Sequence, residues 1–298
     1  MNELTDFLES QDVEYKRNEK LSEKTSIGIG GIANLLILPK SKEELVNLLV
    51  YLSKNNFKYR VVGNMTNLLP CDAVIETVIV STLRINKIHV SGSAVFAECG
   101  ALFSKIISAA AKESAGGAEA LFGIPGSVGG MLSLNAGAYG KSVSDFLSEV
   151  IVYDPSNNEE ILLKKSELAF YYRDSEIKRR MLTVLEARFN FQYGAKSLIY
   201  EKISETKRRR KSTQPIGSKT LGSVFKRSES YPSSYLIDLC GLKGMRIGGI
   251  LVSEKHAGFF INEGGGTARD FLELAQYVKN KVKENFGIEL NEEFELLD

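Results

Sequence analysis

The chain has 298 residues, of which 43% are hydrophobic, and this supply of apolar side chains is enough for two domains of ordinary size. Its 38 Lys and Arg residues nearly balance 37 Asp and Glu residues, so the net charge of +1 gives no global reason to expect nucleic acid or an anionic membrane as a partner. Two histidines and three widely separated cysteines exclude a multi-His metal centre, and no metal is expected.

The N-terminal sequence MNELTDFLESQDVEYK is charged and amphipathic, without the basic start and apolar core of a signal peptide. No apolar run approaches the length of a membrane span, so we expect a cytoplasmic protein. In a reducing compartment Cys71, Cys99 and Cys240 are expected to be reduced, buried thiols.

The first part of the chain alternates strand and helix patterns. Ala33–Leu38 is a short apolar run closed by a proline, and Ser41–Lys54 has leucines at helical spacing behind a Ser41/Glu44 capping box. Tyr59–Val62 and Val74–Val80 have the composition of buried strands, and the loop GNMTNLLPCD lies between them. The order predicts a strand, helix, strand unit.

The middle of the chain predicts further strands and a helix. Ile88–Cys99 reads as two short strands around a Ser-Gly-Ser turn, and Phe103–Ala111 reads as an Ala-rich helix. Met181–Phe191 alternates apolar and polar residues, which is typical of a half-buried strand.

Between Gly123 and Gly140 the chain reads GIPGSVGGMLSLNAGAYG, which is dense in glycine and small residues. Glycine adopts positive φ easily and lets a ligand approach the main chain. Pro125 presets a turn, and the apolar spacing after Ser127 predicts a helix whose first N–H groups would favour an anion. The alternative is a glycine-rich surface loop without a ligand.

The composition changes at KRRRK (207–211), where a helix ends, and we place a domain boundary there. Beyond it we expect a strand-like turn (LGSVFK), a helix over Pro232–Leu239, the glycine-rich IGGILV and a strand (GFFIN). A long helix should run over Thr267–Phe286, with Thr267 and Asp270 as its capping pair.

Two common nucleotide motifs do not explain the glycines. Gly28, Gly30 and Ala33 fit the dinucleotide fingerprint G-x-G-x-x-[G/A], but a polar segment precedes them and a strand follows, which is the reverse of the required context. The P-loop pattern does not occur. A bound dinucleotide would therefore be held by backbone N–H groups of the loops 63–68 and 123–130.

With these two loops the sequence resembles the UDP-N-acetylenolpyruvoylglucosamine reductases (UDP-N-acetylmuramate dehydrogenases), the flavoenzymes of peptidoglycan precursor synthesis. The resemblance runs from about Asn18 to the C-terminus and preserves the order and spacing of many motifs. These are IGIGGIA, GNMTNLL, GIPGSVGG, NAGAYG, YYRDS, GSVFKR, GLKGMRIGG, SEKHAGFFIN and GIELNEEFE. Without an inserted tyrosine-bearing loop, the chain is similar to the shorter of the family's two types.

The resemblance implies an α+β fold of the vanillyl-alcohol-oxidase or p-cresol methylhydroxylase type. Two α+β subdomains, residues 1–82 and 83–211, would bind FAD, with 287–298 returning to the second, and an α+β domain over 212–286 would bind substrate. The resemblance assigns these residues to FAD: Gly63, Asn64, Thr66, Asn67, Gly123, Pro125, Gly126, Ser127, Gly129, Gly130, Asn135, Ala136 and Gly137.

The first flavin loop departs from the family pattern. Met65 and Thr66 stand where the family usually has glycine and serine, and the loop after Leu69 lacks the usual glycine pair. Because a methionine takes positive φ only at a cost, we expect this loop to be reshaped and its affinity for flavin to differ.

The resemblance also implies the reaction and its residues. NADPH would reduce FAD, and the enolpyruvyl ether of UDP-N-acetylglucosamine would then accept a hydride at its methylene carbon, giving UDP-N-acetylmuramate. Charge would develop beside the substrate carboxylate, so the reaction needs a cation or hydrogen-bond donor there and a proton at the α-carbon. The matching residues are Arg173 and Glu293 at the carboxylate and Ser223 as the proton donor.

Each assignment has a plainer alternative. Arg173 could make a surface ion pair, Glu293 could belong to a solvated acidic face, and Ser223 could be an ordinary turn residue. For the diphosphate of the UDP-sugar the sequence offers Lys211, Lys226, Arg227, Lys255 and His256.

We expect a monomer that takes the UDP-sugar as its partner. Two other functions stay open: a flavin oxidase or dehydrogenase of a small alcohol on the same fold, and a catalytically silent relative that binds nucleotide sugars.

Overall fold

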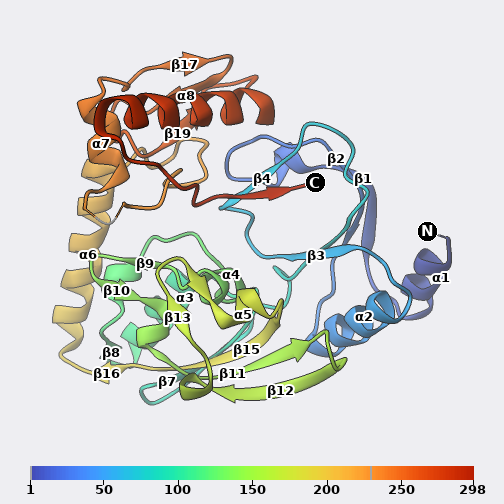
Figure 1. Cartoon of the computed structure of the whole chain (residues 1–298). Coiled ribbons are helices and arrows are strands. Elements are labelled where there is room, and N and C mark those ends of the chain that lie inside the picture. Colours follow the sequence, from blue (N-terminus) through green and yellow to red (C-terminus); the bar gives the residue numbers. More distant parts are fainter. Residues whose placement is uncertain (1, 229) are drawn as a thin grey trace. The chain divides into compact units, whose positions relative to one another are not determined.

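The computed structural model describes residues 2–228 and 230–298 (Figure 1). The chain forms two compact units. The first consists of residues 1–17, 35–64 and 77–208, and the second of residues 18–34, 65–76 and 209–298. Each unit buries a separate hydrophobic core.

The first unit is built on a five-stranded antiparallel sheet. Its order is β12 (Glu159–Lys164), β11 (Leu147–Asp154), β15 (Thr183–Asn190), β7 (Ala94–Glu98) and β6 (Ile88–Ser91). The strands predicted over 88–99 and 181–191 are confirmed. On β15 the alternation is broken at Val184, which is buried like its neighbour Leu185, where the register with β11 shifts between Ile151 and Val152.

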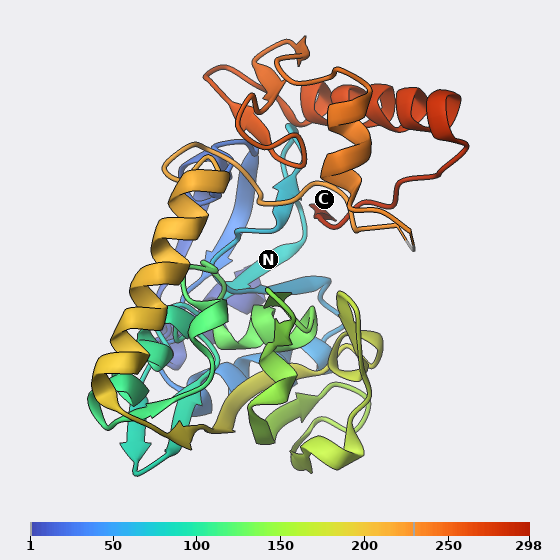
Figure 2. The same cartoon turned by 90° about the vertical axis from the view of Figure 1, so that its left-hand side faces the viewer.

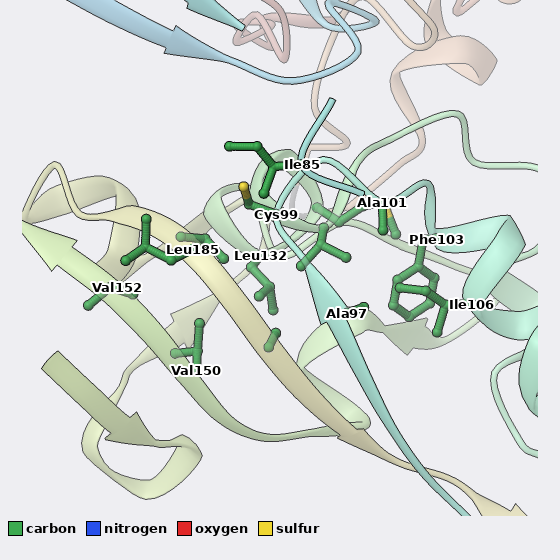
Figure 3. Packing of buried hydrophobic residues seen from close by; sticks show 14 of the residues in the cluster. Ile85, Ala97, Cys99, Ala101, Phe103, Ile106, Leu132, Val150, Val152 and Leu185 are labelled. Carbon is green, nitrogen blue, oxygen red and sulfur yellow. The ribbon is translucent and has the colours of Figure 1, made fainter. Parts of the chain in front are cut away.

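Three helices lie on one side of this sheet, and Figure 1 shows them as α3 (Phe103–Lys112), α4 (Val128–Ser133) and α5 (Glu176–Arg179). Residues of α3 at helical spacing are buried, because that stripe faces the strands. Figure 3 shows Phe103 and Ile106 of α3 and Leu132 of α4 among side chains of the sheet such as Ala97 and Val150. The predicted helices that start at Phe103 and after Ser127 are confirmed.

The strand, helix, strand unit is also present. It comprises β2 (Ile32–Ile37), α2 (Lys42–Lys54) and β3 (Tyr59–Val62), and β5 (Val78–Ser81) pairs in parallel with both of these strands. Ser41 caps α2 by accepting a hydrogen bond from the Glu44 N–H (3.2 Å), while the Glu44 carboxylate accepts from the N–H of Lys40 rather than Ser41. The strand predicted over 74–80 is shorter than expected, because only Ile75 among its first residues is paired, through a bridge to Ala33.

The first unit also contains α1 (Asn2–Ser10) and three two-stranded ribbons. The ribbons pair β8 (Ala115–Gly116) with β16 (Gln192–Tyr193), β9 (Gly137–Ala138) with β10 (Lys141–Ser142), and β13 (Phe170–Tyr171) with β14 (Asp174–Ser175). Three elements contain residues of both units: β1 (Tyr15–Lys20), β2 and α6 (Lys196–Thr213). The helix predicted to end within KRRRK continues to Thr213.

The second unit contains a three-stranded sheet and two helices. The strands β17 (Arg246–Ile247), β18 (Ile250–Val252) and β19 (Phe260–Asn262) are antiparallel. Figure 2 shows the long helix α8 (Ala268–Phe286) with α7 (Ser233–Leu239) beside it. The predicted capping pair of α8 is confirmed, because the Asp270 N–H donates to Thr267 Oγ1 and the Thr267 N–H donates to the Asp270 carboxylate, each at 3.0 Å.

The last strand of the chain pairs with a segment that the sequence predicts as loop. β20 (Glu295–Leu297) runs parallel to β4 (Leu68–Pro70), inside GNMTNLLPCD. The two strands are more than 220 positions apart in the sequence, so no local pattern predicts their pairing. Within the described ranges, no helix is long and apolar enough to cross a membrane.

Candidate functional site

In the first unit, the loop after β3 meets the glycine-rich segment before α4. A Cβ added to Gly63 would overlap the Oγ of Ser127, so the two chains approach as closely as glycine permits. The side chain of Asn64 donates to the carbonyl of Pro125 (2.7 Å). The structure therefore brings together Gly63, Asn64, Pro125 and Ser127, which the sequence places in two separate loops.

Ser127 is the most informative side chain in this contact. It is 1% exposed, and its Oγ has no hydrogen-bond partner among the residues that the structure describes. A buried hydroxyl without a partner is costly unless a ligand supplies one. Gly130, one turn into α4, is exposed, and a Cβ there would meet only Ser127 Oγ, at 3.7 Å. Since glycine weakens a helix and nothing in the chain requires it here, this open position fits the close approach of a ligand.

The predicted anion site at the start of α4 needs a correction. The N–H of Val128 donates to Ala101 O and the N–H of Gly129 donates to Cys99 O, both at 2.9 Å. These two groups are therefore occupied by the turn between β7 and α3. The sequence could not show this, because the carbonyls belong to a segment almost thirty residues earlier in the chain.

Arg173 contacts the NAGAYG turn (135–140), which follows α4. Its guanidinium donates to the carbonyl of Gly137 (3.1 Å) and lies over the ring of Tyr172, 5.1 Å from the ring centre. Asn135, from the same turn, is buried and donates to the carbonyl of Tyr171 (2.9 Å). The structure thus joins Arg173 to the Asn135–Gly137 part of the second predicted flavin segment, within the first unit.

In the second unit, Ser223 and Glu293 lie on adjacent extended segments. The N–H of Glu293 donates to Val224 O (2.8 Å), and the N–H of Val224 donates to Gly258 O (2.9 Å). Ser223 itself forms a bridge with Phe259. Asn67 joins the same network, because its side chain donates to the carbonyl of Glu293 (2.9 Å). Arg173 belongs to the first unit, and Ser223 and Glu293 belong to the second.

The first predicted flavin loop takes the backbone conformation that its sequence makes costly. Met65 has φ of 45° and is buried, so a methionine occupies the left-handed region that glycine prefers. Asn64 is the last residue of its segment of the first unit, while Met65, Thr66 and Asn67 belong to the second unit.

The basic candidates for a diphosphate fall on three segments of the second unit. Lys226 and Arg227 lie three and four positions after Ser223, and the Lys255 ammonium donates to the carbonyl of Lys211. His256 accepts a hydrogen bond at Nδ1 from the N–H of Gly258 (3.1 Å), and burial lowers the pKa of its imidazole. A neutral ring with Nδ1 occupied suits holding the Gly258 turn better than neutralising an anion.

Two residues that sequence patterns missed, the buried Asn262 and the exposed Asp72, organise the second unit. Asn262 donates to the carbonyl of Ile27 (3.0 Å) and accepts from the N–H groups of Gly264 and Gly266 (3.0 and 3.1 Å). The Asp72 carboxylate accepts from the first N–H groups of α8, at Ala268 (2.8 Å) and Arg269 (3.2 Å). Ile27 lies 235 positions from Asn262 and Ala268 lies 196 positions from Asp72, so no motif marks these two long-range contacts.

Two of the three thiols are less buried than predicted. Cys99 is buried, and burial raises the pKa of its thiol to about 12, whereas Cys71 and Cys240 are only half-buried. All three are free cysteines. Across residues 2–228 and 230–298, no group of three His, Cys, Asp or Glu side chains is arranged to hold a metal ion.

Two family models match the chain. Residues 33–159 match the model described as FAD binding domain, and residues 214–297 match UDP-N-acetylenolpyruvoylglucosamine reductase, C-terminal domain. Because the first match spans the site around Gly63 and Ser127, those residues lie within an FAD-binding domain.

Curated relatives carry the same reductase name. The chain is 40% identical to UDP-N-acetylenolpyruvoylglucosamine reductase of Caldanaerobacter subterraneus subsp. tengcongensis, over 94% of this chain and 92% of the relative. It is 38% identical to the Clostridium botulinum protein of that name, over 100% of this chain and 98% of the relative.

A solved structure is similar over almost the whole chain. The crystal structure of UDP-N-acetylenolpyruvylglucosamine reductase from Thermus caldophilus has a TM-score of 0.80 and 29% identity, covering 96% of this chain and 99% of that one. Together with the two family models, this similarity confirms the predicted fold class, an α+β FAD-binding fold followed by a C-terminal α+β domain.

Proposed function

The chain belongs to the UDP-N-acetylenolpyruvoylglucosamine reductases, FAD-binding oxidoreductases of peptidoglycan precursor synthesis, and from this premise we propose that it reduces the enolpyruvyl ether of UDP-N-acetylglucosamine to UDP-N-acetylmuramate with NADPH as the reductant. The observation that carries the proposal is the backbone pairing that holds Ser223 and Glu293 on neighbouring segments. The reaction needs both a proton donor and a group that binds a carboxylate, and these two residues supply them.

The residues of the first unit fit the cofactor. Ser127 offers a buried hydroxyl that lacks a protein partner, and Gly130 leaves open space beside it. We propose that these residues, with Gly63 and Asn64, hold FAD in this segment. When bound, FAD supplies the hydride that NADPH delivers to it.

Arg173 and Glu293 would bind the carboxylate of the enolpyruvyl group. A guanidinium stays charged and presents a planar pair of N–H donors, which suits a carboxylate that gains negative charge as the hydride arrives. Glu293 would complete this environment through a hydrogen bond, with its main chain held by Val224 and Asn67. The pair would polarise the substrate carboxylate.

Ser223 would give the proton. As the methylene carbon accepts the hydride, the electron pair of the carbon–carbon double bond moves to the α-carbon, and the Ser223 hydroxyl donates its proton there. Solvent then restores the proton on the Ser223 oxygen. An alcohol is a weak acid, but a strongly basic carbanion held against it lowers that barrier.

The experiment separates the two half-reactions by stopped-flow absorbance of the flavin. In Ser223→Ala, bleaching of the flavin by NADPH should proceed as in the wild type, while reoxidation by the enolpyruvyl substrate should fall by at least 100-fold. Ser228→Ala, five positions downstream, is the matched control and should leave both rates unchanged. Equal loss of both half-reactions in Ser223→Ala would remove it from this role.

Two other functions are tested by the same preparation. A small-alcohol oxidase would be bleached by its alcohol and not by NADPH. A silent nucleotide-sugar binder would be colourless and would not take up added FAD.

A further inference from the structure

Two crossed hydrogen bonds tie the hairpin of β13 and β14 to the turn after α4. The Asn135 side chain donates to the carbonyl of Tyr171 (2.9 Å), and the Arg173 side chain donates back to the carbonyl of Gly137 (3.1 Å). A third bond acts nearby, from the buried Ser175 hydroxyl to the carbonyl of Ser133, the last residue of α4 (2.7 Å). The hairpin is therefore anchored on both of its strands.

Asn135 lies at the left-handed position that ends α4, where glycine and asparagine are the usual residues. Its φ is 42°, and its N–H donates to Leu132 O (3.2 Å) while the N–H of Ala136 donates to Met131 O (2.8 Å). This pattern is the Schellman ending of a helix, in which glycine is the commonest residue at the left-handed position. The helix ending therefore explains why glycine or asparagine is suitable at position 135. It does not explain why the residue carries an amide side chain, and the hydrogen bonds of that amide do.

The side chain of Asn135 uses both ends of its amide within the protein. Besides donating to Tyr171, it accepts at Oδ1 from the N–H of Ser144 (3.4 Å), and the residue is 7% exposed. A buried amide whose donor and acceptor sides both contact the main chain is placed to fix a neighbouring segment.

Arg173 is held in an unfavourable backbone conformation. It is the second residue of the two-residue turn between Tyr171 and Asp174, with φ of 55°, a conformation for which glycine or asparagine is the usual choice. Strained residues persist where surrounding contacts over-determine them, and here those contacts are the bond to Gly137 and the ring of Tyr172.

We propose that Asn135 is a positioning residue for Arg173, which clamps the hairpin to the end of α4 and sets where the guanidinium points, and that its amide is not a flavin contact. The inference rests on the proposed role of Arg173 at the substrate carboxylate. Ser127 and Gly130 lie at the start of α4, and Asn135 lies at its end. The same helix therefore carries the proposed flavin contacts and the residue that positions Arg173.

Asn135→Gly is a clean perturbation, because glycine keeps the left-handed helix ending and removes only the amide. Asn135→Asp keeps an acceptor for the Ser144 N–H and loses the donor to Tyr171. The chain offers a matched control in Asn56, which ends α2 in the same Schellman pattern, with φ of 55° and bonds from Asn56 N to Ser53 O and from Phe57 N to Leu52 O, and which is exposed.

The first measurement follows the flavin in stopped flow. In Asn135→Gly and Asn135→Asp we expect wild-type flavin content and bleaching by NADPH, with reoxidation by the enolpyruvyl substrate about 100-fold slower, since a displacement of about 1 Å in a substrate-binding group costs that much. Asn56→Gly should match the wild type in every step. Loss of flavin from both Asn135 variants, or an unchanged reoxidation rate, would overturn the proposal.

The second measurement needs neither cofactor nor substrate, so it survives a failure of the proposed function. Tyr171 and Tyr172 are 48% and 52% exposed, and release of the hairpin should speed limited chymotryptic cleavage after them at least fivefold in both Asn135 variants and not in Asn56→Gly. Equal cleavage in all variants, or cleavage accelerated throughout the chain together with a fall in Tm, would reduce Asn135 to an ordinary structural residue. A wild-type protein that cannot reduce the enolpyruvyl substrate would refute the proposed function and leave this clamp measurement valid.

Discussion

Removal of the Ser127 hydroxyl should change apoprotein stability and flavin affinity in opposite directions. The Oγ of Ser127 is buried without a protein partner, so the folded apoprotein carries the desolvation cost of that hydroxyl without a compensating bond. Ser127→Ala removes the cost in the apoprotein and also removes the bond that we propose the hydroxyl makes to FAD.

The expected magnitudes follow from the two environments. An unsatisfied buried hydroxyl costs about 1–3 kcal/mol, so even partial relief of about 1 kcal/mol should raise the apoprotein Tm by about 2–4 °C. A hydrogen bond to a charged group such as a phosphate contributes about 1.5–3 kcal/mol, which corresponds to a rise of about 10-fold to 100-fold in the Kd for FAD. The overlap of a Gly63 Cβ with Ser127 Oγ adds a test, because Gly63→Ala should be partly rescued by Ser127→Ala.

The assay is thermal unfolding of deflavinated protein together with titration of FAD by quenching of its fluorescence. Ser175→Ala is the matched control, since Ser175 is equally buried but its hydroxyl donates to Ser133 O (2.7 Å) and accepts from the Lys178 N–H (3.3 Å). That variant should lose about 1–2 kcal/mol. A Ser127→Ala apoprotein that is less stable than the wild type, or one that binds FAD with unchanged Kd, would refute the reasoning.

Four further predictions follow from particular residues. Arg173→Lys keeps the charge but loses the planar pair of donors, so turnover measured in steady state should fall at least 10-fold while the absorbance of bound flavin is retained; unchanged turnover would contradict its role. Met65→Gly should be more stable than Met65→Ala by about 1 kcal/mol in urea unfolding, because φ of 45° penalises alanine, and the reverse order would count against that strain. Burial lowers the pKa of His256 below its value in the unfolded chain, so the unfolded state binds a proton first as the pH falls. The stability that is present above about pH 6.5 is therefore lost at lower pH. Between pH 7.5 and 5 the Tm should drop less in His256→Gln than in the wild type. Iodoacetamide at pH 8 should label Cys71 and Cys240 in the folded protein and spare Cys99, whose thiol has a pKa of about 12, as read by mass spectrometry; early labelling of Cys99 would contradict its burial.

Local patterns were sufficient where neighbours in sequence supply the stabilising contacts. The capping pair of α8 and the hairpin of β6 and β7 depend on residues a few positions apart, and both are as predicted. The prediction for 74–80 was too long, and β4 was missed, because their pairing depends on partners elsewhere in the chain. Edge pairing of this kind leaves no periodic signal.

The candidate site divides in the same way. The glycines, Ser127, Arg173, Ser223 and Glu293 were named from motifs, because the types of residue and their order carry that information. The occupied N–H groups of Val128 and Gly129 and the clamp of Asn135 on the hairpin were not predictable, since each depends on a carbonyl from a different segment. The division of the chain into three domains stays a prediction.

The sequence by itself determined the composition of two cores, the periodic elements, the dense glycine segment and, through its motifs, the family. These are properties of residue type and spacing along the chain, which short-range sterics and capping translate directly into structure. Only the tertiary structure decided which polar groups are satisfied by the protein and which, like the Ser127 hydroxyl, have no partner among the described residues. The physical reason is that hydrogen bonds between distant segments are chosen by the packing of the whole unit, and a linear pattern does not contain that choice.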